Sequence, residues 1–168
     1  LRAQAVDALL PPARAQAEIE LLIAQGSFRL GLERADEALA QATASGDRSR
    51  IGITQSLRAR LLAGIGDDAR ARDAFERAER SLAGDPALQL ANRLNRANFE
   101  ASAGRFDAAI DAYRALIDAA KKLGDPALEA RARANELRAR VEADPGPRLG
   151  SDPIAPRALR RATRSVLE

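Results

Sequence analysis

The chain has 168 residues, enough for one globular domain or a short repeat array. Leu, Ile, Val and Ala must supply most of its core, because Trp, Met, Cys and His are absent and aromatic residues make up only 3%. Without Cys and His there is no disulfide, no Cys/His zinc site and no Ser-His-Asp or Cys-His catalytic group. The formal net charge is +3, and residues 154–168, with four arginines and one glutamate, account for all of it. The remaining residues carry equal numbers of acidic and basic side chains, so they do not indicate a nucleic-acid-binding surface.

Glycines punctuate the chain at nearly constant intervals, each about half of a helical-hairpin repeat. Strong helix formers fill the intervals, and runs rich in β-branched residues are absent. Each interval accommodates a helix of roughly 25 Å and a tight turn. Glycine just past a helix end supplies left-handed backbone. We therefore expect an all-α chain of antiparallel helical hairpins, punctuated by Gly26, Gly46, Gly66, Gly84, Gly104 and Gly124.

The stretch from Gly84 to Gly124 is the clearest repeat unit. Asp85 begins it, and Asp125 begins the next unit; each aspartate can accept hydrogen bonds from the free amides at a helix start. A proline follows each aspartate at the first helical position, where the missing N–H costs nothing. The unit therefore predicts one helical hairpin with aspartate N-caps.

In chain order, residues 1–12 read as the end of a preceding helix or as an N-terminal cap, and residues 13–143 as a helical repeat domain. Residues 144–156 are rich in Pro and Gly and predict a linker, and residues 157–168 form a basic segment. Within the domain we expect seven helices, at residues 13–25, 27–44, 47–63 and 67–82, between Gly84 and Gly104, between Gly104 and Gly124, and at residues 125–143.

The last of these helices carries many charges. Its apolar residues Leu128, Ala132, Leu137 and Val141 form only a thin stripe. One packed face and one solvated face are typical of a capping helix, because the terminal repeat of an array needs a polar exterior.

Four columns of residues recur when the hairpins are aligned on the glycines that follow their first helices. Small residues dominate three of the columns, and bulkier ones appear in the column of Ala35, Phe75 and Tyr113, so that helices approach closely and one large side chain fills the gap. In this respect the chain resembles tetratricopeptide (TPR) repeats over about residues 13–143. The columns are Ile19, Ala59 and Ala97; Gly31, Ala71 and Ala109; Ala35, Phe75 and Tyr113; and Ala38, Ala78 and Leu116.

The resemblance implies an α-solenoid of about three hairpins plus a capping helix, coiled as a right-handed superhelix. The period here, from Asp85 to Asp125 for example, is longer than that of the family by most of a helical turn in each helix. It is similar to the longer TPR-like variant found in bacterial regulators and ahead of effector domains. In that family the first helix of each hairpin lines a concave groove.

The expected groove residues are polar and repeat along the chain. Asparagine amides could bracket the backbone of an extended peptide, and arginines could bind a carboxylate in a bidentate manner. The alternative is a polar inner face without a ligand. Asn95 and Asn135 lie one full repeat apart, as do Asn98 and Arg138. The candidate peptide-binding residues are Arg60, Asn95, Asn98, Asn135 and Arg138, with apolar contacts from Leu57 and Leu94.

We therefore expect a non-catalytic scaffold without cofactor or metal, which binds a protein or peptide segment, including one that bears a carboxylate. The alternative is the regulatory or sensing arm of a larger bacterial effector, and self-association through the open ends is a third hypothesis. Paired carboxylates such as Asp67-Asp68 fit a helix start better than an active site. Nucleic acid is not an expected partner, and no stretch has the roughly 20 apolar residues of a membrane span. Cysteine content leaves the compartment open, and the bacterial cytoplasm is favoured over the periplasm.

Overall fold

The computed structural model describes residues 12–144, and this part of the chain contains seven α-helices and no strand. The predicted all-α class and the seven helices between residues 13 and 143 are confirmed, with ends that differ by one or two residues. The expectations for residues 1–11 and 145–168 lie outside the described residues. The helices are α1 (Pro12–Ala24), α2 (Phe28–Ser45), α3 (Arg48–Gly64), α4 (Asp68–Ser81), α5 (Pro86–Ser102), α6 (Phe106–Leu123) and α7 (Pro126–Ala143).

Aspartate side chains cap four of the helices. Each accepts a hydrogen bond from the backbone N–H three residues further on, which satisfies one of the free donors of the first turn. The predicted caps at Asp85 and Asp125 are confirmed, with distances of 3.0 and 2.9 Å to the backbone nitrogens of Leu88 and Leu128. Asp47 and Asp67 cap α3 and α4 in the same way.

Glycine ends five of the helical intervals in the predicted left-handed conformation, with φ between 68° and 79°. Gly84 is the exception, because it is not among the glycines with positive φ. After α4 the chain turns through residues 82–84, and the Asp85 N–H donates to the Leu82 carbonyl at 2.9 Å. This short turn needs no left-handed residue, so the prediction for Gly84 was wrong.

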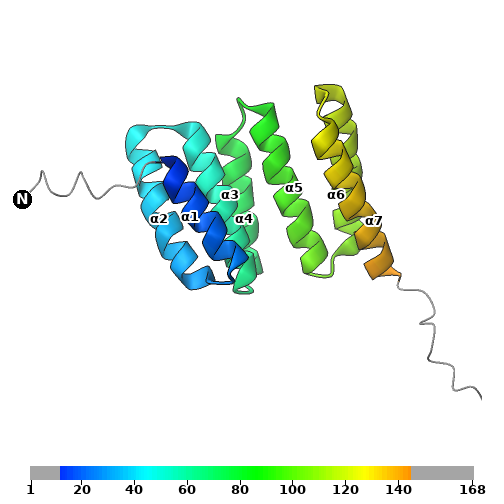
Figure 1. The fold of residues 1–168 in the computed structure, drawn as a ribbon, viewed down its shortest axis with the longest axis horizontal. Helices are drawn as coiled ribbons and strands as arrows, with labels where there is room; N and C mark the ends of the chain where they lie inside the picture. Colours follow the sequence, from blue (N-terminus) through cyan, green and yellow to red (C-terminus); the bar gives the residue numbers. More distant parts are fainter. Residues whose placement is uncertain (1–11, 145–168) are drawn as a thin grey trace, which may run out of the picture.

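The hairpins follow one another along the molecule, from α1 and α2 at one end to α6 and α7 at the other, and helices consecutive in the chain run antiparallel (Figure 1). Each helix packs against the next one, and α1, α3, α5 and α7 also contact one another in succession. In contrast, α2 and α4 make no close backbone contact, and neither do α4 and α6. The odd-numbered helices therefore form a continuous layer, and the even-numbered helices lie separately against it.

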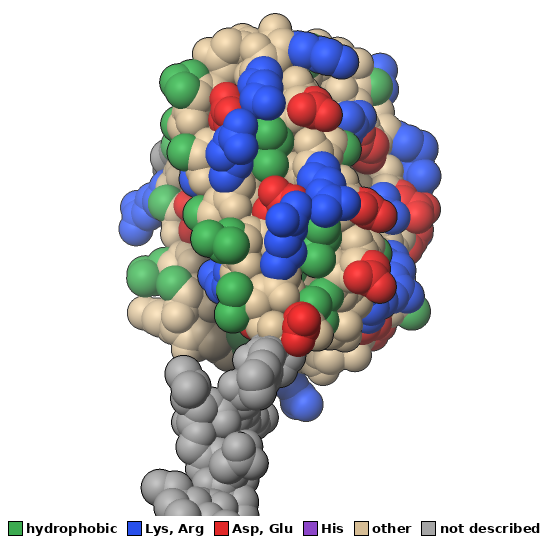
Figure 2. Space-filling view, turned by 90° about the vertical axis from the view of Figure 1, so that its right-hand side faces the viewer, with side chains coloured by type: hydrophobic (Ala, Val, Ile, Leu, Met, Phe, Trp, Pro, Cys, Tyr) green, Lys and Arg blue, Asp and Glu red, His purple; other side chains and the backbone are tan. Residues whose placement is uncertain are grey.

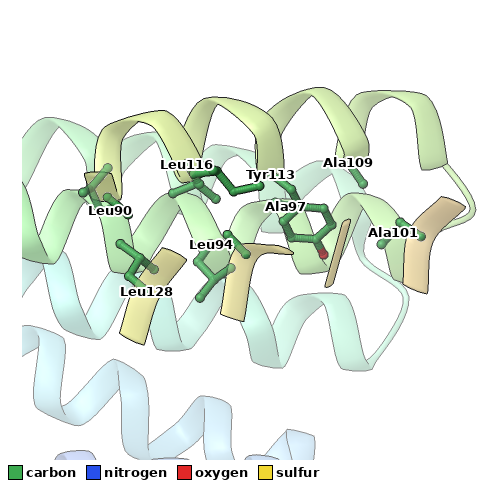
Figure 3. Close-up of a cluster of buried hydrophobic side chains, with 12 residues drawn as sticks. Leu90, Leu94, Ala97, Ala101, Ala109, Tyr113, Leu116 and Leu128 are labelled. Carbon is green, nitrogen blue, oxygen red and sulfur yellow. The ribbon is translucent and has the colours of Figure 1, made fainter. Parts of the chain in front are cut away.

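The core consists of three clusters of buried side chains. The first joins α1, α2 and α3, the second joins α3 and α4 with Phe99 of α5, and the third joins α5, α6 and α7. In the third cluster Tyr113 of α6 projects towards α5 among aliphatic side chains (Figure 3). All members of the four sequence columns are buried.

The apolar stripe predicted for α7 was half wrong. Leu128 and Ala132 are buried, but Leu137 and Val141 are 64% and 60% exposed. The buried row continues instead through Ala139, which is 1% exposed, because the predicted stripe crossed from one helix face to another. The side of the molecule formed by α6 and α7 accordingly shows hydrophobic side chains among the charges (Figure 2).

Candidate functional site

A hollow of about 500 Å³ opens on the face formed by the odd-numbered helices. All four of these helices contribute to it, so this face curves inward. We call it the odd-helix groove. Alanine side chains and Leu94 line this space, and charged residues surround it. Its lining consists of Glu20 (α1), Arg60 (α3), Ala87, Ala91, Leu94 and Asn95 (α5), and Ala127, Leu128 and Arg131 (α7), with Asp125 at the start of α7.

Two of the five predicted site residues, Arg60 and Asn95, line this groove. The Asn95 side chain is half-buried, and its Nδ2 donates to Ser56 Oγ at 3.3 Å, which holds the amide of α5 against α3. The half-buried Arg60 makes no side-chain hydrogen bond or ion pair with another described residue. Its guanidinium is therefore available for an external acceptor.

The other three predicted residues, Asn98, Asn135 and Arg138, do not line the groove. They form a polar link between helices: Asn98 Oδ1 accepts from Asn135 Nδ2 and from the Tyr113 hydroxyl, both at 2.8 Å. Asn135 Oδ1 in turn accepts from Arg138 Nη2 at 3.4 Å. Amides that already bridge α5, α6 and α7 are less free to bind a peptide than Asn95.

Tyr113 is the buried end of this link. Its side chain is fully buried, and burial raises the pKa of its phenol above the usual range, against a smaller lowering by the Arg138 charge. Because the hydroxyl donates to Asn98, the neutral phenol is the form that the structure holds.

The two leucines that the sequence predicts as apolar contacts for a peptide lie in different places. Leu94 lines the groove, although it is only 2% exposed. Leu57 is instead buried at 4% exposure in the cluster that joins α1, α2 and α3, together with Ile19 and Leu61. Its placement in the groove was therefore wrong, because a leucine on the first helix of a hairpin can equally face the neighbouring hairpin.

Arg131 is the cationic residue of the groove that sequence reasoning missed. It is exposed, lies in the same hollow as Arg60, and makes no side-chain hydrogen bond or ion pair with another described residue. The signal was available in the repeat: Arg131 lies one full repeat after Ala91, which lines the groove on α5. Projecting every residue of α5 by one repeat would have found it.

The groove offers side chains that are suited to binding a peptide or a carboxylate. Two arginines without ion pairs among residues 12–144 can bind carboxylates, the Asn95 amide can pair with a peptide bond, and alanines leave room for a main chain. No group of three or more metal-ligating side chains occurs within residues 12–144. None of the seven described helices combines the length and the apolar character that a membrane crossing requires.

Comparisons with protein-family models, with curated proteins and with solved structures found no match for this chain.

Proposed function

We propose that this chain is a TPR-like α-solenoid that acts as a non-catalytic interaction module and binds an extended peptide segment in the odd-helix groove. The observation that carries the proposal is a hollow lined by four successive odd-numbered helices, in which Arg60 and Arg131 have no ion pair with a described residue.

The solenoid itself is part of the proposal, and two observations support it. The small and bulky residues of the four sequence columns are buried throughout. The odd-numbered helices contact one another in succession, while the even-numbered ones do not, which is what a coiled stack of hairpins with one continuous inner layer requires. A right-handed superhelix with its concave side on the odd-numbered helices follows from this proposal.

In the proposed complex the peptide lies across α3, α5 and α7. Its main chain passes over Ala87, Ala91 and Ala127, whose short side chains permit close approach. Asn95 hydrogen-bonds a peptide group, and Arg60 and Arg131 bind a side-chain or terminal carboxylate. Peptides with an acidic residue or a free C-terminus are the expected ligands.

The test begins with selection from a library of random short peptides that end in free carboxylates, followed by calorimetric titration of the selected peptides. The double variant Arg60→Gln, Arg131→Gln should weaken binding by about tenfold or more, since each lost charged hydrogen bond contributes at least about 1.5 kcal/mol. Arg77→Gln on α4 is the matched control, because Arg77 pairs with Asp73 and does not line the groove.

Equal affinity of the double variant and the wild type for every selected peptide would refute the groove assignment. Asn95→Ala separates the amide from the charges, since it should weaken all selected peptides regardless of their acidic residues. A similar loss in the Arg77→Gln control would show that net charge, and not the groove, determines binding.

A further inference from the structure

A second cavity, of about 490 Å³, lies between α4, α5 and α6. We call it the α4–α6 cavity. It shares no lining residue with the odd-helix groove. Its lining is an apolar surface of Leu90, Ala97, Ala108, Ala112, Ala115, Leu116 and Ala119, with Glu79, Asn92, Arg93, Arg96 and Glu100 as polar residues.

The repeat shows why this junction is hollow. At the preceding junction, between α2, α3 and α4, Leu32 packs against a cluster that includes the buried Leu62, and Leu39 of α2 is partly buried. One repeat later, the residues that correspond to Leu32, Leu39 and Leu62 are Arg72, Glu79 and Glu100. Three leucines are thus replaced by three charged residues, which do not fill an apolar space between helices.

The α6 wall of the cavity is lined by alanines one or two turns apart. Ala108, Ala112, Ala115 and Ala119 form one row of this helix. The corresponding row of α4, one repeat earlier, includes the long side chains Arg70 and Arg77. The short side chains of α6 leave an apolar surface beside the charged wall of α4.

The acidic residues that line the cavity are paired with arginines, whereas a further arginine has no ion pair with a described residue. Glu79 accepts from Arg93 at 2.7 Å, and Glu100 is hydrogen-bonded to Arg105 and lies 3.7 Å from Arg72. Both carboxylates are therefore paired within the protein. The exposed Arg96 makes no ion pair or side-chain hydrogen bond with another described residue.

A neighbouring hollow of about 250 Å³ extends the cavity. It shares Leu90, Arg93 and Ala119 with it and adds Lys122, a second cation without an ion pair among residues 12–144. The combined site has apolar walls and cations at its rim. This combination complements an anion with an apolar body.

Asn92 adds a requirement for a hydrogen-bond donor on the ligand. It lines the cavity, is 2% exposed, and donates through Nδ2 to the Phe75 carbonyl and to Glu79, both at 3.2 Å. Its Oδ1 is buried and has no hydrogen-bond partner in the part of the chain that the structure describes. A buried acceptor of this kind is unfavourable unless it receives a donor, so a ligand N–H or O–H is expected to pair with it.

We propose that the α4–α6 cavity binds a small organic anion with an apolar body and a hydrogen-bond donor, in which Arg96 pairs with the anionic group and Asn92 accepts the donor. The volume lies within the range of small-molecule sites. The basic segment 157–168 does not match this site in charge, because its four arginines would be repelled by Arg96 and Lys122, which have no ion pair among residues 12–144. This site differs from the peptide groove in ligand class and location, so either one can fail without the other.

The test is a titration of the full chain, followed by amide NMR, with three related probes. Indole-3-butyrate has an apolar ring, an N–H donor and a carboxylate. Its N-methyl derivative lacks the donor, and the corresponding amine has a cation in place of the anion. The acid should cause saturable shifts confined to amides of α4, α5 and α6 around the cavity. The N-methyl acid should bind about tenfold more weakly, and the amine should not saturate.

Three variants localise the binding. Ala112→Leu narrows the cavity from its α6 wall and should abolish the shifts while leaving the protein folded. Arg96→Gln should weaken the acid about tenfold, as expected for one charged hydrogen bond. Ala134→Leu introduces the same alanine-to-leucine change at an exposed position of α7 that does not line the cavity, and should leave binding unchanged.

Several outcomes would overturn the proposal. These are no saturable shift with the acid, equal binding of acid and amine, retained binding in Ala112→Leu, or shifts centred on Arg60 and Asn95. If the acid instead moves the signals of residues 157–168 together with those of the cavity, that segment is the occupant and the proposal is wrong. The thermal midpoint of Ala112→Leu without probe separates loss of binding from loss of folding.

Discussion

Asn98 connects three helices through one oxygen atom. Its Oδ1 accepts from Tyr113 on α6 and from Asn135 on α7, while its own backbone belongs to α5. A neutral hydrogen bond of this kind contributes about 0.5–1.5 kcal/mol net, but leaving a buried partner unpaired costs about 1–3 kcal/mol. At the scale of the residue, polar groups on the first helices of these hairpins therefore contribute to packing between helices.

The phenol of Tyr113 gives this arrangement a pH signature. Its pKa is raised in the folded chain, mainly by burial, above the ordinary value of about 10. A raised pKa means that the folded state holds the proton more tightly than the unfolded state. The contribution of the neutral, buried phenol to the free energy of unfolding is therefore fully present below the unfolded pKa and is lost as the pH rises through the folded pKa. Because Tyr113 is the only tyrosine and Trp is absent, ultraviolet absorbance titration reads this group alone.

We expect the absorbance midpoint of the native chain to lie above that of the chain in denaturant. A native midpoint equal to or below the denatured one would contradict the buried, hydrogen-bonded phenol. Tyr113→Phe is the control for stability: it should cost about 1 kcal/mol at neutral pH, and the difference from wild type should shrink as the pH rises through the native midpoint.

At the scale of the element, Gly52 sets how closely α3 and α4 approach. A Cβ at this position would lie 2.4 Å from Leu82 Cγ and 3.3 Å from the Ala78 carbonyl oxygen. Leu82 is itself 2% exposed and has little room to move. Gly84 is the opposite case, since its backbone lacks a positive φ and a Cβ there would meet nothing within 4 Å.

Gly52→Ala should therefore lower the free energy of unfolding by about 1–3 kcal/mol, the usual cost of overpacking, although alanine favours helices more than glycine. Gly84→Ala should raise it by about 0.4–1 kcal/mol by restricting the unfolded chain. Urea denaturation of the two variants checks both signs. A stabilising Gly52→Ala would show that α3 and α4 are not in close contact at this point.

How far sequence reasoning reached depends on whether a feature is local. The caps at Asp85 and Asp125 and the left-handed turn at Gly104 depend only on a few consecutive residues, and they were predictable. The exposure of Leu137 depends on which helix lies beside α7, and no local pattern contains that information.

The residues predicted for the candidate site also differ in how well the sequence placed them. Arg60 and Asn95 were found because they repeat on the first helices of the hairpins, and they line the groove. Asn98 and Asn135 repeat equally well but bond to each other, since their side chains meet between α5 and α7. The α4–α6 cavity was not predicted, because it arises from a comparison of two junctions and not from a motif.

At the scale of the whole molecule, the junction between α4 and α5 divides two differently packed halves. Apolar clusters hold α1 to α4 together and α5 to α7 together, and Phe99 of α5 also belongs to the cluster of α3 and α4. Between them lie a cavity and the ion pairs of Glu79 and Glu100, with Phe99 in contact with Phe75 as the main apolar bridge. A weakly packed junction of this kind allows the two halves to unfold with different free energies.

Native-state hydrogen exchange should therefore resolve two cooperative units. Ile117→Ala truncates a side chain of the α5–α7 cluster that is 6% exposed, and Leu61→Ala truncates one of the α1–α3 cluster that is 0% exposed. Each should lower protection in its own half by about 2–5 kcal/mol, the usual cost of such truncations, and in the other half by less than half as much. Equal losses along the whole chain in both variants would mean that the charged junction transmits stability as fully as the junction between α2, α3 and α4, and that α1 to α7 unfold as a single unit.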